Sequence, residues 1–249
     1  MAEVVRHTEE IGETPAHYSG KKAEYVQTMF ADIADRYDLL NAVLSFNQHK
    51  SWRKTAVRLA RVQPGATCLD VCTGTGDFAL ELAHTTGATG RVIGSDFCEP
   101  MIRNGLHKIA KAQAPLSLMV GDAERLPYGS NLFDVVTVGF GIRNVAHLEV
   151  AVQEMARVIK PGGRVVILEF NRPPRRWYKP FVDFYLFQVL PRIGGLMSKK
   201  EAYTYLPESM KHFVSREKLA DAMHGAGLTE IEIHDLNLGT VCIHIGTKA

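Results

Sequence analysis

Short, continuous runs of apolar residues alternate with longer mixed segments between residues 63 and 170. Runs of this length predict buried β-strands, and five are expected, at Thr67–Thr73, Arg91–Asp96, Leu116–Val120, Phe133–Phe140 and Arg164–Phe170. The segments between them predict helices at Asp77–Thr85, Pro100–Gln113 and Leu148–Ile159. Apolar strands joined by helices are typical of a parallel sheet covered on both faces, and right-handed crossovers make it a doubly wound α/β fold.

The end of the chain departs from this rhythm. Ser215–Gly225 predicts a helix with Ser215 as its cap. The segments Glu230–Leu236 and Thr240–Ile245 follow, separated by only a few residues around Gly239. So short a connection cannot cross over the sheet, and the two strands are therefore expected to be antiparallel. A mostly parallel seven-stranded sheet with such a hairpin resembles the Rossmann-like class I methyltransferases that use S-adenosylmethionine (SAM), whereas a plain dinucleotide domain would continue with another crossover helix.

The chain is expected to form one domain with additions to its edge. Residues 1–22 are polar and acidic and predict a flexible arm, and residues 23–249 are expected to form the domain. Within it, residues 23–62 carry apolar positions at three- and four-residue steps, which predict helices around a loop at Ser45–His49. Residues 171–213 form an insert before the last helix.

The composition mainly excludes certain classes of protein. The chain is 46% hydrophobic and 22% charged, as in an ordinary globular protein, and its net charge of +2 gives no basic field for nucleic acid. Its four cysteines form no CxxC pair, which favours a reducing compartment and a cytoplasmic protein. The N-terminus lacks a signal-peptide core, and the most apolar run, Phe181–Leu190, is too short and too polar to span a membrane.

A glycine turn follows the first predicted strand. Gly74–Ala79 fits the G-x-G-x-x-[GA] fingerprint of nucleotide-binding turns, in which glycines let the backbone approach the ligand. Asp70 and Asp77 flank the turn, and an acid at the helix start repels a pyrophosphate. Acid on both sides favours a cationic or zwitterionic ligand such as SAM over a dinucleotide. In the alternative interpretation, Asp77 only caps its helix.

Further residues at strand ends complete a predicted adenosine pocket. Asp96 ends the second strand, where a carboxylate can accept both ribose hydroxyls of either NAD or SAM. The apolar side chains of Phe97 and Met101, which come next, are expected to lie against an adenine ring. Met101 is equally consistent with a core position. After the third strand, Asp122 can accept the adenine amino group while the amide of Ala123 reaches a ring nitrogen.

Ligands of open α/β sheets bind at the carboxyl ends of the strands. Four predicted strands end at or beside a candidate ligand-binding residue, namely Asp70, Asp96, Asp122 and Gly139. Four such residues at one edge of the sheet are a stronger signal than any single motif. The predicted cofactor-binding residues are Asp70, Gly74, Thr75, Gly76, Asp96, Phe97, Met101, Asp122, Ala123 and Gly139.

Several other segments resemble the quinone C-methyltransferases, which methylate demethylmenaquinol or the benzoquinol precursor of ubiquinol. Tyr37–Trp52 and Arg157–Phe170 are similar to the two signatures of this family. The resemblance runs from about Tyr25 to the C-terminus and includes four shorter matches, at Phe140–Asn144, Val189–Gly194, Tyr203–Ser209 and Ile243–Lys248. The chain departs from the family pattern at Cys72, Gly139, Asn171 and Val214, and these departures bear on the choice of quinone and leave the cofactor unchanged.

The resemblance implies SAM-dependent C-methylation of a polyprenylated quinol, with demethylmenaquinol as the first substrate and the ubiquinone precursor as the alternative. It also implies active-site roles for Arg143 and Asn144. A hydroquinone becomes carbon-nucleophilic on losing a hydroxyl proton with a pKa of about 10, by analogy with tyrosine. Because a guanidinium stays protonated, Arg143 is expected to stabilise the phenolate or order a water, not to act as a base. The alternative is a structural ion pair.

Tyr37, Asn41, His49 and Trp52 are predicted to form a lid over the substrate head group, although His49 is equally consistent with a hydrogen bond that only pins a loop. The histidines are scattered without metal-ligand spacing, so no metal site is expected. The insert Arg172–His212 begins with basic residues around Trp177 and continues with aromatic residues, which suits a prenyl tail and peripheral contact with the inner face of the cell membrane. A homodimer contact or a core helix explains the insert equally well.

Three competing functions fit parts of the pattern. An NAD-linked oxidoreductase requires room for a pyrophosphate at the glycine turn. A non-catalytic scaffold of a quinone-synthesis complex would keep the fold and lack turnover. A methyltransferase for RNA or another small molecule would share the cofactor pocket, although no basic stripe supports RNA.

Overall fold

The structure is a computed structural model that describes residues 22–171, 177–185, 188, 205 and 208–249. Residues 1–21 of the predicted arm and most of the predicted insert lie outside the described residues, whereas Lys22 is helical. Within the described ranges no helix is both long and apolar enough to cross a membrane.

The predicted seven-stranded sheet is confirmed. Its spatial order is β3-β2-β1-β4-β5-β7-β6, and every neighbouring pair is parallel except the two that involve β7. The strands are β1 (Thr67–Val71), β2 (Arg91–Asp96), β3 (Leu116–Val120), β4 (Phe133–Gly139), β5 (Ile159–Phe170), β6 (Leu228–Leu236) and β7 (Val241–Lys248).

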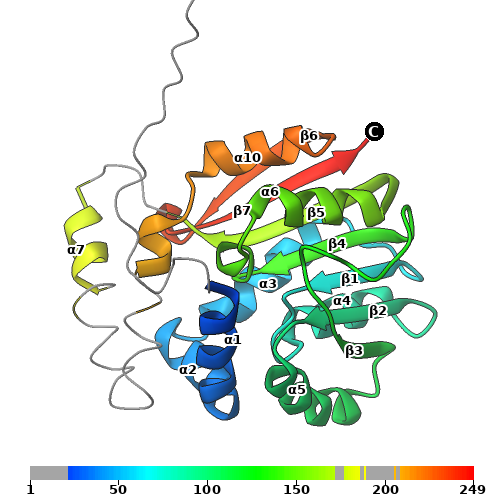
Figure 1. The fold of residues 1–249 in the computed structure, drawn as a ribbon, viewed down its shortest axis with the longest axis horizontal. Coiled ribbons are helices and arrows are strands. Elements are labelled where there is room, and N and C mark those ends of the chain that lie inside the picture. Colours follow the sequence, from blue (N-terminus) through cyan, green and yellow to red (C-terminus); the bar gives the residue numbers. More distant parts are fainter. Residues whose placement is uncertain (1–21, 172–176, 186–187, 189–204, 206–207) are drawn as a thin grey trace, which may run out of the picture.

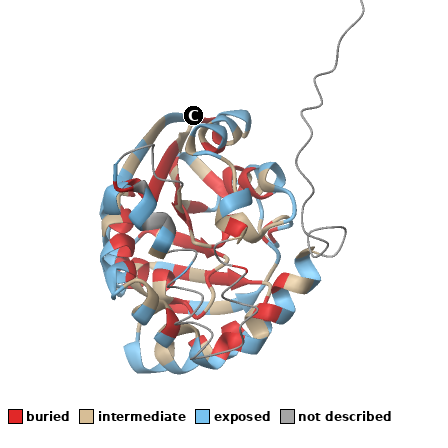
Figure 2. Cartoon of the chain, turned by 90° about the vertical axis from the view of Figure 1, so that its left-hand side faces the viewer, coloured by how far each residue is buried: buried red, intermediate tan, exposed pale blue. Residues whose placement is uncertain are grey.

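Helices cover both faces of the sheet (Figure 1). They are α1 (Lys22–Ile33), α2 (Tyr37–Leu44), α3 (Gln48–Leu59), α4 (Asp77–Thr86), α5 (Glu99–Ala112), α6 (Leu148–Val158), α7 (Lys179–Phe184) and α10 (Arg216–Gly225), with 3₁₀ turns at Ala34–Arg36 (η2), Ile142–Asn144 (η3) and Asn237–Gly239 (η5). Buried residues follow the strands, and exposed ones lie on the outer sides of the helices (Figure 2).

Alternate residues of each strand face different cores, as the pleat requires. Cys68 of β1 packs with α3 and α4 on one face, whereas Leu69 and Val71 pack with α6 and α10 on the other. A third cluster joins α1 and α2 to Cys98 and Met101 at the start of α5. The arrowheads of β1 and β4 point toward the side where α1 and α2 lie (Figure 1), so these helices cover the carboxyl ends of the strands.

Several predicted boundaries were wrong, most of all where α6 meets β5. β5 begins at Ile159 instead of Arg164, and α6 ends at Val158, because Pro161 disfavours helical backbone in the residue before it. The loop predicted at Ser45–His49 is confined to the three residues between α2 and α3. Phe46 and Asn47 adopt left-handed backbone (φ 49° and 59°), and α3 starts again at Gln48. His49 therefore lies on a helix.

Candidate active site

Two adjoining cavities lie at the carboxyl ends of β1, β2 and β4. The smaller has a volume of about 210 Å³ and the larger about 500 Å³. Their walls share five residues, which are Phe30, Tyr37, Cys72, Gly139 and Phe140. A ligand in one cavity can therefore meet a ligand in the other at this shared wall.

The structure brings the predicted site residues together around these cavities. The smaller cavity is lined by Gly74, Asp96, Phe97, Met101, Asp122, Ala123, Gly139 and Asn144. The larger is lined by Asp70, Thr75, Arg143, Asn41, His49 and Trp52, with Tyr37 and Gly139 shared. Gly76 lines neither, because its Cα faces the side chain of Leu118 and its amide donates to the carbonyl of Thr73 at 2.9 Å. Gly76 therefore contributes to the shape of the turn, on the side that packs against Leu118 and away from both cavities.

Asp96 is held rigidly at the floor of the smaller cavity. Its Oδ2 accepts from the amide of Gly74 at 2.8 Å, and its Oδ1 accepts from the amide of Cys98 at 2.9 Å. The left-handed backbone of Gly74 (φ +57°) turns its amide onto this carboxylate. Burial raises the pKa of Asp96, and both amide bonds oppose the rise. Each oxygen keeps a second lone pair for a hydroxyl donor.

The rest of the smaller cavity fits an adenosine group. Phe97 and Met101 supply apolar walls, and the Oδ1 of Asp122 accepts from the amide of Glu124 at 2.9 Å, which leaves the other oxygen available. A Cβ added to Gly121 would lie 2.4 Å from the hydroxyl of Ser95, so this part of the wall packs so closely on β2 only because the residue is glycine. Carboxylates at both ends of an apolar slot match the ribose hydroxyls and the amino group of adenosine.

Asp70 is a buried acid beneath the turn. Thr73 donates to its Oδ2 at 2.5 Å and Thr137 to its Oδ1 at 2.6 Å, and burial raises the pKa of Asp70 to about 6. Asp70 is thus ionised at neutral pH, although its burial in the folded protein disfavours the charged form.

A stability measurement can test this assignment. An unfolded aspartate has a pKa near 3.8, so at about pH 3 the group is mostly protonated in both states, and the free energy of unfolding falls as the pH rises from about 4 to 6. At pH 7 the penalty is about 3 kcal/mol. Asp70→Asn should therefore raise the free energy of unfolding in urea at pH 7, but not at about pH 3. Asp134→Asn is the matched control, because Lys160 and the amide of Thr67 lower the pKa of Asp134 and its replacement should destabilise.

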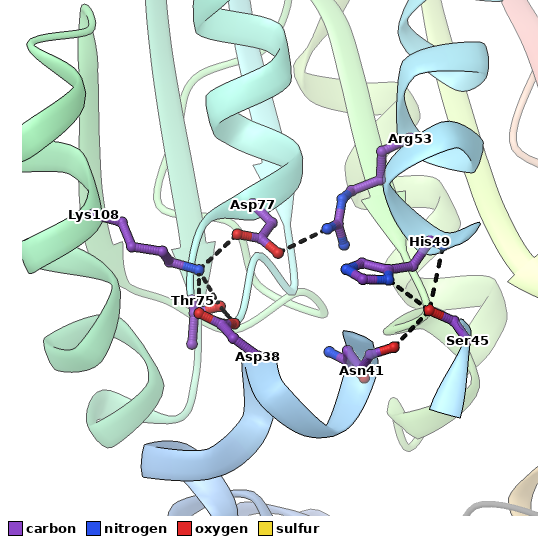
Figure 3. A network of polar contacts seen from close by, with 8 residues as sticks. All are labelled: Asp38, Asn41, Ser45, His49, Arg53, Thr75, Asp77 and Lys108. Atoms are coloured by element: carbon purple, nitrogen blue, oxygen red, sulfur yellow. Dashed lines mark hydrogen bonds and ion pairs between the residues drawn. The ribbon is translucent and has the colours of Figure 1, made fainter. Parts of the chain in front are cut away.

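Asp77 is not a free acid beside the turn. Arg53 pairs with its Oδ2 at 2.7 Å and Lys108 with its Oδ1 at 2.6 Å, as Figure 3 shows. These cations lower the pKa of Asp77 against the effect of burial. The prediction that Asp77 itself would attract a cationic ligand or repel a pyrophosphate was therefore wrong, because its charge is already compensated.

The same network ties the N-terminal helices to the glycine turn. Lys108 of α5 also contacts Asp38 of α2 at 2.7 Å and Thr75 at 2.8 Å, and Thr75 donates to Asp38 at 2.6 Å (Figure 3). Sequence analysis missed Asp38, Arg53 and Lys108, since nothing in their spacing indicates that three helices meet at one turn.

The predicted lid residues all line the larger cavity. Tyr37 and Asn41 come from α2, and His49 and Trp52 from α3. Part of the wall is aromatic, with Phe140 lying 5.9 Å from Trp52 and 4.7 Å from Phe170 between ring centres. A cavity whose surface is mainly apolar and partly aromatic suits a flat ring ligand.

Arg143 lies in a buried ion pair at the boundary of the larger cavity. Its guanidinium lies 2.8 Å from Oε1 of Glu169, donates to the carbonyl of Phe140 and to Ser209 at 3.3 Å, and stacks 5.4 Å from the ring centre of Phe170. Burial raises the pKa of Glu169, which Arg143 opposes. Arg143 thus forms the ion pair that the alternative interpretation predicted. It also lines the larger cavity, where it can reach a ligand.

Asn144 faces the smaller cavity, and its Oδ1 accepts from the hydroxyl of Tyr205 at 2.9 Å. The neighbouring residues Arg143 and Asn144 therefore reach the two cavities separately. Glu169 lies within the signature segment Arg157–Phe170, and no site role was predicted for it. Its sequence signal is a single acid within the apolar strand β5, where burial without a partner would be costly.

Within the described ranges no three histidine, cysteine, aspartate or glutamate side chains gather closely enough to hold a metal ion. The two cavities present carboxylates, amides, the buried guanidinium groups of Arg53 and Arg143, an imidazole and aromatic rings.

The chain is similar to known proteins over most of its length. Residues 18–248 match the ubiE/COQ5 methyltransferase family. A ubiquinone/menaquinone biosynthesis C-methyltransferase (UbiE) of Geotalea daltonii is 44% identical over 230 residues, which are 92% of this chain and 98% of the relative. A demethylmenaquinone methyltransferase of Shouchella clausii is 42% identical over 229 residues, 91% of this chain and 97% of the relative.

Solved structures support the fold independently. A SAM-dependent methyltransferase from Thermotoga maritima is similar with a TM-score of 0.63 and 21% identity, covering 90% of this chain and 99% of that one. The predicted fold, enzyme class and cofactor are thereby confirmed: the protein is a SAM-dependent methyltransferase, and the chain belongs to the ubiE/COQ5 methyltransferase family.

Proposed function

We propose that this chain transfers the methyl group of SAM to a ring carbon of demethylmenaquinol, giving menaquinol. The observation that carries the proposal is the pair of adjoining cavities, one fitted to adenosine and one aromatic, with a common wall at Gly139 and Phe140. Relatives named for demethylmenaquinone and for ubiquinone/menaquinone biosynthesis support a quinol substrate. The benzoquinol precursor of ubiquinone is the alternative acceptor.

The residues of the smaller cavity would hold the adenosine of the cofactor. Asp96 would accept the ribose hydroxyls, Asp122 the adenine amino group, and Phe97 and Met101 would flank the ring. When bound, SAM supplies a methyl group on a positively charged sulfur. Asp70 lies under the glycine turn and lines the larger cavity, so its carboxylate is the one left to favour a cationic ligand.

The protein must also exclude water from the acceptor ring and align the nucleophilic ring carbon with the methyl group and the sulfur of the cofactor. Arg143 has a fixed positive charge, because Glu169, Phe140 and Ser209 hold it at the cavity wall. There it would stabilise the phenolate that makes the ring carbon nucleophilic, directly or through a water. Asn144 would position a group at the smaller cavity, with its carbonyl held by Tyr205.

The test is restoration of a quinone in cells. A strain deficient in quinone methylation, complemented with this chain, should regain menaquinone, identified by the mass of the extracted lipid. Restoration of ubiquinone alone would replace the proposed acceptor by the benzoquinol. Restoration of neither quinone, with the protein folded and expressed, would contradict the proposal.

Lys108→Met should weaken SAM binding about tenfold, the effect of roughly 1.4 kcal/mol. The substitution leaves Asp38 without its ion pair and Asp77 with Arg53 alone, so α2 is less firmly tied to the turn that holds the cofactor. Calorimetric titration with SAM measures the effect. Lys111→Met on the exposed side of the same helix is the control, and equal affinities of the two variants would contradict the role given to Lys108.

We also propose that the rim of the larger cavity meets a lipid surface, from which the prenylated substrate enters. Three exposed apolar side chains, Phe46, Phe181 and Leu238, line the cavity, and their exposed fractions are 71%, 70% and 66%. Trp177 (83%) stands beside Phe181 with its ring centre 6.5 Å away. A cavity with apolar walls that continue outward in this way suits a substrate with a long tail. The basic residues of the predicted patch, Arg172–Arg176, lie outside the described residues.

Trp177→Ser combined with Phe181→Ser should reduce binding to phosphatidylglycerol-containing vesicles at least about tenfold. The reason is that burial of each ring in the lipid would contribute more than about 1 kcal/mol to the free energy of binding. Co-sedimentation measures the bound fraction. Leu132→Ser removes an exposed apolar residue beside the opposite end of β4 and should have no effect. Equal vesicle binding by both variants would contradict the membrane proposal and leave the homodimer as the alternative use of this surface.

A further inference from the structure

His49 has polar contacts that determine which of its ring nitrogens carries the proton. It lies in the first turn of α3 and lines the larger cavity. Its Nδ1 lies 2.5 Å from the hydroxyl oxygen of Ser45, and the same oxygen lies 2.5 Å from the backbone carbonyl oxygen of Asn41. The amide of His49 also donates to this hydroxyl at 3.4 Å (Figure 3).

Only one arrangement of hydrogens satisfies these contacts. A carbonyl oxygen can only accept, so the hydroxyl of Ser45 donates its single proton to Asn41. That oxygen has no second proton for the ring, and Nδ1 of His49 must therefore donate to it. In the neutral ring, a proton on Nδ1 leaves Nε2 as a hydrogen-bond acceptor.

The surroundings keep the ring neutral and this acceptor available. Burial and the neighbouring guanidinium of Arg53 lower the pKa of His49 to about 4. Within the described ranges no hydrogen bond reaches Nε2. Figure 3 shows the second ring nitrogen pointing away from Ser45, toward the side where Arg53 and Asp77 lie, and both of these side chains line the same cavity.

We propose that His49 selects the reduced form of the ring substrate. The Nε2 lone pair accepts a hydroxyl proton of the hydroquinone, whereas the oxidised quinone presents only carbonyl lone pairs and is repelled. Only the hydroquinone can become a carbon nucleophile, so this acceptor reserves the cavity for the productive redox state. The inference rests on the proposed quinol-methylating function. His49 is a specificity-determining residue in it, and Ser45 is a positioning residue that fixes the tautomer.

The first test reads the tautomer in the ligand-free protein. Nitrogen-15 NMR of the imidazole rings distinguishes a protonated from a bare ring nitrogen, and loss of signals in His49→Gln assigns the resonances. The expected result at pH 7 is a protonated Nδ1 and a bare Nε2, with the two tautomers mixed in Ser45→Ala. A protonated Nε2 in the unsubstituted protein would overturn the inference while leaving the proposed function untouched.

The second test compares two ligands that differ only in redox state. 2,3-Dimethyl-1,4-naphthoquinone and its hydroquinone carry no ring position that reacts with the thiol of Cys72. In a Trp177→Phe background Trp52 is the single tryptophan, and its fluorescence reports binding in the larger cavity. Titrations without oxygen should show the hydroquinone binding at least about tenfold more tightly than the quinone.

His49→Gln should reduce this preference to near unity, because an amide side chain can either donate or accept. His107→Gln, on the exposed side of α5, should retain it. A preference that survives in His49→Gln, or none in the unsubstituted protein, would overturn the role of His49. Binding of neither ring in any redox state would instead contradict the proposed function.

Discussion

Arg143→Met should lower methyl transfer at least about a hundredfold and also destabilise the protein by about 3–5 kcal/mol. The loss of transfer is expected because one fixed donor aimed at a developing oxyanion contributes this much to catalysis. The loss of stability is expected because the variant leaves the carboxylate of Glu169, which is fully buried, without its partner. Single-turnover transfer and urea unfolding measure the two effects.

A double variant separates these two roles. Arg143→Met with Glu169→Gln removes both charges, so most of the lost stability should return. Transfer should stay low, because no cation remains at the cavity wall. If transfer returned together with stability, Arg143 would be only half of a structural ion pair, and the role in catalysis would be contradicted.

Asp96→Asn should weaken SAM binding about a hundredfold, since hydrogen bonds from the ribose hydroxyls to a charged acceptor would be lost at a cost of about 3 kcal/mol in total. The amide keeps the size of the carboxylate, and one of its atoms can still accept from the backbone. Calorimetric titration gives the dissociation constant, and thermal unfolding shows whether the fold persists.

Glu99→Gln is the matched control for Asp96. It removes an acid three residues away, in the first turn of α5, where the carboxylate is largely exposed and paired with Arg103. Its affinity for SAM should be unchanged. If Asp96→Asn also bound SAM with unchanged affinity, the smaller cavity would not be the adenosine pocket.

The centre of the sheet could be predicted from sequence because β1, β2, β4 and β5 are mostly buried and therefore read as continuous apolar runs. Asp96, Asp122 and Gly139 could be placed for the same reason, since the carboxyl ends of neighbouring parallel strands share one edge of the sheet. The hairpin at the C-terminus followed from the length of its connection alone.

Long-range pairing of charges could not be predicted in this way. Asp77 was interpreted from its neighbours in sequence, but its partners Arg53 and Lys108 come from two other helices. Glu169 of β5 pairs with Arg143 of η3, and no spacing rule connects the two residues. His49 was expected in a loop but lies on a helix, because Phe46 and Asn47 adopt left-handed backbone and α3 begins at Gln48. Such backbone is uncommon for residues other than glycine.

The most direct test of the account is transfer of label from methyl-labelled SAM to a quinol by the purified full-length protein. With demethylmenaquinol in lipid vesicles under reducing conditions, the account predicts label on the ring carbon of menaquinol, and little label when the ring is supplied in its oxidised form. Binding of SAM without label in any quinol would contradict the account and favour a protein that keeps the fold without the activity.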